Sequence, residues 1–142
     1  MPPELLARLT AWFAEHPDLL GRPATDLQIE AAQRTLSVVF DAQYVAYIKQ
    51  FGGSFAGFEI HAFENGPMIG RETVTELTQW FRRSLGEAVP IELRDALVIS
   101  GDGGGNAILI NSRGEIILHL HEENEIELLY PSLHDMIGAG LP

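Results

Sequence analysis

The first 51 residues carry hydrophobic side chains every three or four positions, the spacing that gathers them on one face of a helix. This spacing predicts a first helix over residues 4–15, which ends at His16-Pro17 because the residue before a proline avoids helical angles. A second helix is expected to begin at Thr25, since Gln28 stands three residues later as in a capping box, and to end near Ser37.

A third helix is predicted from Asp41, which can cap it, to Gly52-Gly53, a pair that accepts the positive φ angles found at helix ends. Its hydrophobic stripe consists of Tyr44, Tyr47, Ile48 and Phe51. Because the connection to the preceding helix is short, we expect these two helices to pack as a hairpin.

The middle of the chain predicts one strand and one further helix. Alternating residues over 55–63 favour a strand, which a turn at 65–67 follows. Thr73 and Glu76 have capping-box spacing, and Gly86 directly follows the helical pattern, so a fourth helix is expected between them.

Beyond Pro90 the pattern changes to short hydrophobic runs that turn residues separate. We interpret these runs as strands over residues 96–99, 107–110, 116–121 and 126–130. Their short connections are typical of hairpins, so the strands are expected to form an antiparallel meander. A last helix is predicted from Pro131-Ser132 to Ile137. Together the patterns indicate an α+β fold.

Composition indicates one globular domain over residues 1–142, because 46% of the residues are hydrophobic and 20% are charged. A chain of this length can fold without disulfides or a structural metal, and it contains no cysteine. Thiol nucleophiles, redox motifs and cysteine zinc sites are therefore excluded. No cationic leader opens the sequence and no apolar run approaches the ~18 residues that span a bilayer, so we expect a cytoplasmic protein.

Acidic residues outnumber basic ones by 20 to 9, which gives a net charge of -11. This charge repels phosphate backbones and anionic lipids, so neither nucleic acid nor a membrane is an expected partner. The charge instead favours a protein with a basic surface. The excess lies mainly in residues 72–142, which hold 12 acidic and 4 basic side chains, against 8 and 5 in residues 1–71.

The glycine-rich segment 101–106 is interpreted as a turn. Consecutive glycine amides can bind phosphate, but no Lys-Ser/Thr pair or helix follows, and Asp102 would place a negative charge beside the phosphate. A calcium loop beginning at Asp102 would lack the required glycine and the final glutamate. We therefore assign Gly101, Gly103, Gly104 and Gly105 to a tight connection.

His119 and His121 raise the question of a metal site, because strand alternation places both on one face, where Glu123 could join them as a ligand. Their spacing does not match the helical zinc motif, and we favour a hydrogen-bonded or solvated surface pair. No serine lies in a nucleophile motif, and no carboxylate pair stands out from the acidic surface. We therefore nominate no catalytic residue, no metal ligand and no cofactor.

An acidic cluster lies near the end of the expected meander and consists of Glu122, Glu123, Glu125 and Glu127. Two interpretations remain open. The cluster keeps a hairpin tip soluble, or it attracts a cationic partner together with Asp102. In the second case these five residues would contact the partner.

Residues 36–53 contain a short connection that leads into a helix with Tyr44 and ends at Phe51-Gly52-Gly53. Residues 98–110 contain a glycine- and aspartate-rich turn that enters a strand, and Glu115-Ile116 and Ser132-Leu133 follow. This order of motifs, over about residues 25–137, resembles the SUKH superfamily, the Smi/Knr-type proteins. The resemblance implies an α+β domain in which helices pack against a mostly antiparallel sheet of about five to six strands.

The resemblance also implies binding rather than catalysis. Bacterial proteins of the superfamily neutralise toxins that competing cells exchange, and fungal ones regulate cell-wall assembly. An immunity protein that covers the basic face of a cognate toxin is therefore the first functional hypothesis. A regulatory or scaffolding adaptor of an endogenous complex is the second, and a metal-dependent enzyme is the third.

Overall fold

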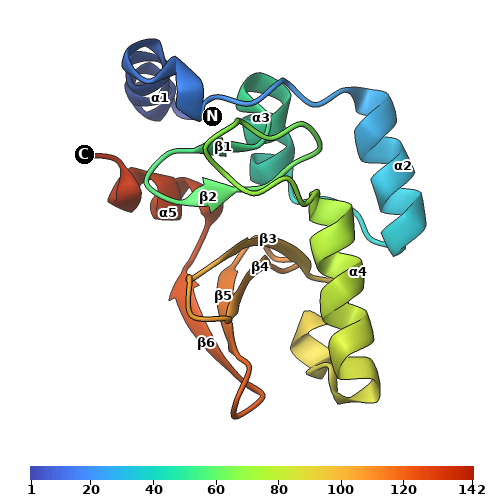
Figure 1. The fold of residues 1–142 in the computed structure, drawn as a ribbon. Helices are drawn as coiled ribbons and strands as arrows, with labels where there is room; N and C mark the ends of the chain where they lie inside the picture. Colours follow the sequence, from blue (N-terminus) through green and yellow to red (C-terminus); the bar gives the residue numbers. More distant parts are fainter.

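A computed structural model describes residues 1–142, which form five helices and two antiparallel sheets (Figure 1). The helices are α1 (Pro3–Glu15), α2 (Asp26–Leu36), α3 (Ala42–Phe51), α4 (Val74–Leu85) and α5 (Leu133–Gly140), and the short 3-10 turns are η1 (Pro17–Leu19), η2 (Gly86–Ala88) and η3 (Ile91–Leu93). The small sheet pairs β1 (Ser54–Phe55) with β2 (Glu59–Ile60), and the large sheet contains β3 (Leu97–Gly101), β4 (Ala107–Ile110), β5 (Ile116–Leu120) and β6 (Glu125–Tyr130) in that order. The expected α+β fold and antiparallel meander are confirmed.

The helix starts follow from the capping residues seen in the sequence. The Thr25 hydroxyl accepts from the Gln28 amide while the Gln28 side chain accepts from the Thr25 amide, and Thr73 and Glu76 form the same reciprocal box in α4. The Asp41 carboxylate accepts hydrogen bonds from two amides of the first turn of α3. These side chains satisfy amides that the helix itself leaves unpaired, so they define where α2, α3 and α4 begin.

The end of α3 differs in part from the expectation. Gly52 has φ 61°, as a helix-closing glycine should, but Gly53 lies outside the left-handed region. Gly53 instead requires glycine because a Cβ there would overlap the Asn65 side chain, and its carbonyl accepts from the Gly66 amide at 2.7 Å. The pair therefore joins α3 to the loop before α4.

Two local predictions are wrong. The single strand expected over residues 55–63 is a hairpin of two short strands, because the chain reverses at Gly57, whose φ is 82°. The expected hairpin of α2 and α3 is also not the main packing of α2, which lies against α4. The Arg82 guanidinium of α4 donates to the Leu36 carbonyl at 2.8 Å and holds the end of α2 there.

The large sheet is covered on both faces over β3 and β4. One face joins the main core with α1, α3, α5 and the β1–β2 hairpin, and it contributes Leu97, Ile99, Ile108, Ile110 and Ile116. The other face packs under α4, and its core consists of Val98, Leu109 and Ile117 with Phe81, Leu93 and Ala96. No helix is both long and apolar enough to cross a membrane. β6 lies at the outer edge of the sheet, where residues 125–128 are exposed (Figure 1).

Candidate partner-binding surface

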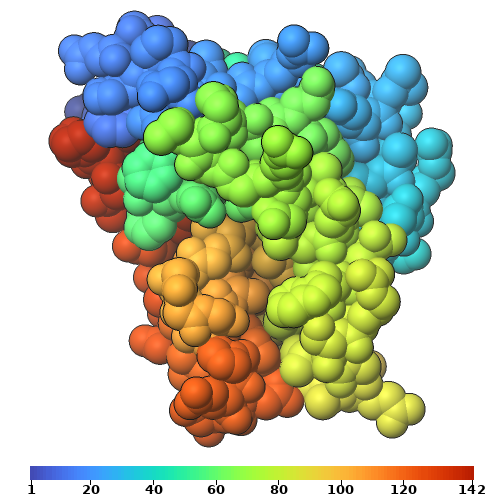
Figure 2. Space-filling view, in the orientation of Figure 1, coloured from blue at the N-terminus to red at the C-terminus, as the bar shows by residue number.

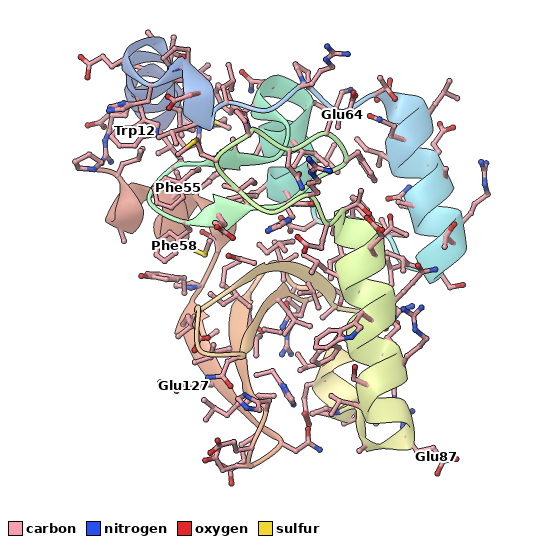
Figure 3. The ribbon with its side chains drawn as sticks, in the orientation of Figure 1. Trp12, Phe55, Phe58, Glu64, Glu87 and Glu127 are labelled. Carbon is pink, nitrogen blue, oxygen red and sulfur yellow. The ribbon has the colours of Figure 1, made fainter.

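A groove of about 680 Å³ opens between the β1–β2 hairpin and the outer part of the large sheet. Its apolar lining consists of Phe55, Phe58, Ile108, Leu118, Leu129 and Tyr130. The Phe58 and Tyr130 rings meet edge to face with their centroids 6.1 Å apart, and this contact joins the hairpin to β6. In Figure 3 Phe55 and Phe58 lie on the same side of the molecule as Glu127. The groove therefore offers aromatic surface to a partner.

The hairpin that forms one wall of the groove is held by both ends of the chain. The Trp12 indole N–H of α1 donates to the Phe55 carbonyl at 2.9 Å. At Gly57 the hairpin lies so close to α5 that a Cβ would be 2.3 Å from the Gly140 carbonyl oxygen. These contacts fix the aromatic wall before any partner arrives, which lowers the entropy cost of binding.

Acidic side chains border the groove. Glu59 and Asp102 belong to its lining. Glu127 stands directly opposite Leu118 in the β5–β6 register, and Glu125 stands opposite Leu120. Because directly paired residues place their side chains on the same face, both glutamates lie on the groove side of the sheet. The structure thus brings residues 59, 102, 125 and 127 to the border of one apolar surface.

Asp102 is held ionised within the glycine-rich loop. Its carboxylate accepts from the Asn106 side chain at 2.8 Å and from the Gly104 amide at 2.8 Å, and these hydrogen bonds, that of Asn106 first, lower the pKa of Asp102. Asn106 also accepts from the His121 amide at 3.0 Å, so it connects the loop to the start of the β5–β6 turn. Of the loop glycines, only Gly103 and Gly105 have positive φ. Asp102 and the acidic cluster consequently share one end of the sheet.

The histidines do not form the surface pair that we favoured. His119 is buried, its Nε2 lies 2.7 Å from the Asn124 side-chain oxygen, and its ring meets Phe81 edge to face. His121 is exposed, with its Nδ1 2.6 Å from the Asn106 oxygen. No group of three histidine, aspartate or glutamate side chains lies close enough together to hold a metal ion. His119 thus holds the Asn124 side chain in the β5–β6 turn. The same side chain also donates to the Ala88 carbonyl of η2 at 2.9 Å, which ties the turn to η2.

A second cavity, of about 310 Å³, lies on the other side of the glycine-rich loop and was missed in the sequence. Figure 2 shows the loop in orange beside the side chains of α4 in yellow-green. The cavity contains the buried His61, whose Nε2 is 3.5 Å from the Glu59 carboxylate, and Trp80, which is 62% exposed. A tryptophan outside the hydrophobic stripe of α4 is the signal that could have indicated this cavity.

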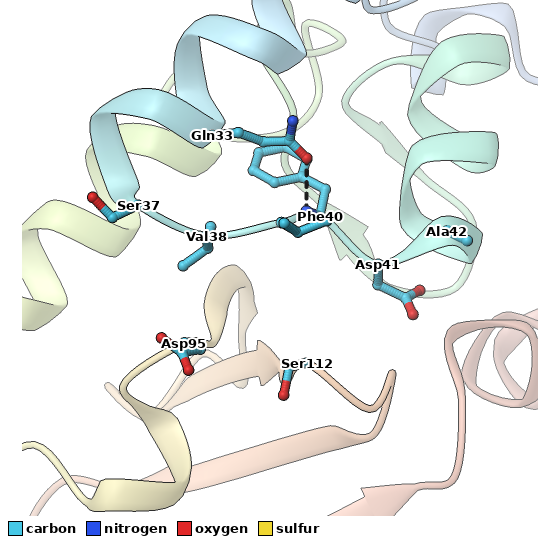
Figure 4. Close-up of a pocket in the computed structure, with 9 residues that line it drawn as sticks. Gln33, Ser37, Val38, Phe40, Asp41, Ala42, Asp95 and Ser112 are labelled. Atoms are coloured by element: carbon cyan, nitrogen blue, oxygen red, sulfur yellow. Dashed lines mark hydrogen bonds between the residues drawn. The ribbon is translucent and has the colours of Figure 1, made fainter.

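A third hollow, of about 550 Å³, lies beside the connection from α2 to α3 (Figure 4). Two of its polar side chains already bind the backbone. The Gln33 side chain accepts from the Phe40 amide at 2.8 Å, and the Asp41 carboxylate caps α3. We therefore assign this hollow to the structure of the connection rather than to binding.

The chain matches a known protein family. The model of the SMI1 / KNR4 family (SUKH-1) matches residues 23–139. This range extends from the loop before α2 into α5, so it contains the hairpin and all four strands of the large sheet. No curated protein matches the chain significantly.

Proposed function

The chain belongs to the SMI1 / KNR4 family (SUKH-1), and on this premise we propose that it is a non-catalytic immunity protein that covers a cognate bacterial toxin. The observation that carries the proposal is the aromatic groove with acidic residues along its border. We name this surface the acid-bordered groove and define it by Phe55, Phe58, Leu118, Leu129 and Tyr130 with Glu59, Asp102, Glu125 and Glu127.

The two parts of the acid-bordered groove suit the two tasks of an inhibitor. Aromatic anchors in a desolvated pocket supply most of the binding energy of protein interfaces. Surface charge of one sign speeds the encounter with a partner of the opposite sign. A toxin that acts on an anionic substrate has a basic face, which this surface would occlude in the cytoplasm of the protected cell.

Affinity capture followed by a growth assay tests the proposal. Proteins that the tagged chain retains from its native host are identified and expressed in a surrogate host, alone and together with the chain. We expect at least one captured protein to stop growth alone, and co-expression to restore growth. The variant Phe58→Ala should restore growth less well, because it removes an aromatic anchor.

The control is Met68→Ala, which removes a large apolar side chain that is 62% exposed and lies outside the groove, whereas Phe58 is half-buried. It should restore growth like the parent. Captured proteins that never impair growth would contradict the immunity function and favour an adaptor of an endogenous complex. Equal loss in both variants would remove the groove from the proposal.

A further inference from the structure

The outer edge of β6 is open. β6 pairs only with β5 in the large sheet, and residues 125–130 make no backbone hydrogen bond outside that pairing. The opposite edge of the sheet is not open in the same way, because the His61 amide at the end of β2 donates to the Ile99 carbonyl of β3 at 2.8 Å. An open edge presents unpaired N–H and C=O groups that can receive another strand.

The side chains of β6 alternate between two kinds. Glu125 and Glu127 lie on the groove side, while Ile126 and Leu128 lie on the α4 side, where they are 37% and 56% exposed. A strand that pairs with β6 would place its own side chains beside these. The matching strand therefore carries basic residues on one face and apolar residues on the other.

A second copy of this chain is a poor match for the edge. Two β6 strands related by a two-fold axis would run antiparallel and bring glutamates of one copy beside those of the other. Like charges directly opposite each other destabilise a strand pair. The two glutamates thus act against self-pairing and leave the edge to a strand of opposite charge.

We propose that β6 receives an extended segment of the partner, in which lysine or arginine residues alternate with apolar residues, as an added strand of the sheet. The inference rests on the proposed function as a binding protein and deepens it, because it assigns main-chain hydrogen bonds to the contact. The added strand would run beside the acid-bordered groove, so its basic side chains would meet Glu125 and Glu127 there.

Hydrogen exchange tests the strand addition with a defined probe. The probe is a peptide in which Lys and Val alternate over about eight residues, and its control carries Glu in place of Lys. Amides of residues 125–130 that point outward should exchange freely in the protein alone and become at least about tenfold slower with the Lys peptide. The Glu peptide should leave them unchanged.

A charge-reversal variant provides the second measurement. Both glutamates are exposed, so the double variant Glu125→Lys/Glu127→Lys should fold, and it should prefer the Glu peptide over the Lys peptide by about tenfold. The control Glu15→Lys/Glu30→Lys makes the same change of charge on α1 and α2 and should keep the parent's preference.

Each outcome decides the inference. Absence of Lys-peptide binding, or binding that leaves exchange at 125–130 unchanged, would overturn it. Slowed exchange without peptide that grows with protein concentration would show a second copy at the edge and also overturn it. Neutralisation of a captured toxin without slowed exchange would leave the immunity function in place and remove only the strand addition. Exchange slowed by the Lys peptide, together with the absence of any captured toxin, would support the strand addition and contradict the immunity function.

Discussion

The two outer strands of the large sheet have opposite surroundings. In β3, residues 97–100 are all buried, because the main core lies on one face and α4 on the other. In β6, residues 125–128 are all exposed and alternate between acidic and apolar. The same sheet thus has one buried edge that contributes to stability and one exposed edge, at which we propose that a partner binds. Substitutions at the two edges should separate these roles.

Truncation at the two edges should give the largest difference. Ile99→Ala removes a fully buried side chain of β3 and should lower the free energy of unfolding by about 2–5 kcal/mol. Leu128→Ala in β6 should cost less than about 1 kcal/mol, because its side chain is largely solvated already. Urea denaturation, monitored by circular dichroism, measures both free energies of unfolding. Similar losses would contradict the division of the sheet into a structural and an exposed edge.

A second difference concerns two glycines, Gly52 at the buried end of α3 and Gly103 in the exposed loop between β3 and β4. Gly52 and Gly103 both have positive φ, which costs an alanine about 1–2 kcal/mol. A Cβ on Gly52 would also lie 2.0 Å from the Arg22 carbonyl oxygen, whereas a Cβ on Gly103 meets nothing within 4 Å. Gly52→Ala should therefore lower the melting temperature clearly more than Gly103→Ala. Equal losses would mean that backbone strain accounts for both effects and that the close contact with Arg22 adds nothing at residue 52.

The sequence predicted those elements whose signals are local. The capping boxes at Thr25 and Thr73 predicted the starts of α2 and α4. The hydrophobic runs after Pro90 predicted the strands of the meander. Each of these signals acts within a few residues. The division of residues 55–63 into a hairpin of two strands was not predicted from the sequence. That reversal depends on how closely Gly57 approaches Gly140, a contact between residues far apart in the chain.

The candidate surface was predictable only in part. The acidic cluster was visible as a run of charges, but its position beside an aromatic groove depends on the β5–β6 register and on the placement of the hairpin. His119 was placed at the surface because alternation alone does not show that Phe81 of α4 covers it. Tertiary packing decides these points.

Removal of the charges on β6 should change association without changing stability. In Glu125→Thr/Glu127→Thr the repulsion between two copies of β6 disappears, and threonine favours strands. We expect self-association that increases with concentration, while the free energy of unfolding at low concentration changes by less than about 0.5 kcal/mol. Light scattering coupled to size exclusion measures the mass. A variant with the same mass as the parent at every concentration would mean that the glutamates do not protect this edge.

The smallest effect concerns the exposed loop beside the groove. Asn106→Ala removes the first cause of the lowered pKa of Asp102, so this pKa should rise toward the ordinary aspartate value. A carboxyl group whose pKa is lowered by folding stabilises the folded state fully only at pH values above its ordinary pKa. Any contribution of Asp102 to stability is therefore lost as the pH falls through its folded-state pKa, and the variant should lose less. An NMR titration of the carboxyl carbon measures the shift. An unchanged pKa would mean that Asn106 does not hold Asp102 ionised.

The association rate with the captured toxin tests the central claim most directly. The quadruple variant Glu122→Gln/Glu123→Gln/Glu125→Gln/Glu127→Gln is compared with the parent and with a control that carries the same change at Glu4, Glu15, Glu30 and Glu92. Salt shortens the reach of exposed charge from ~10 Å at 0.1 M to ~3 Å at 1 M, so the attraction exerted by these four glutamates, of which Glu125 and Glu127 belong to the acid-bordered groove, should weaken as salt rises.

Stopped-flow mixing at several salt concentrations gives the rates. We predict that the quadruple variant associates about tenfold more slowly at low salt and responds less to added salt, while the control stays near the parent. Equal rates and equal salt dependence for the quadruple variant and the control would contradict the claim that this surface attracts and covers the partner.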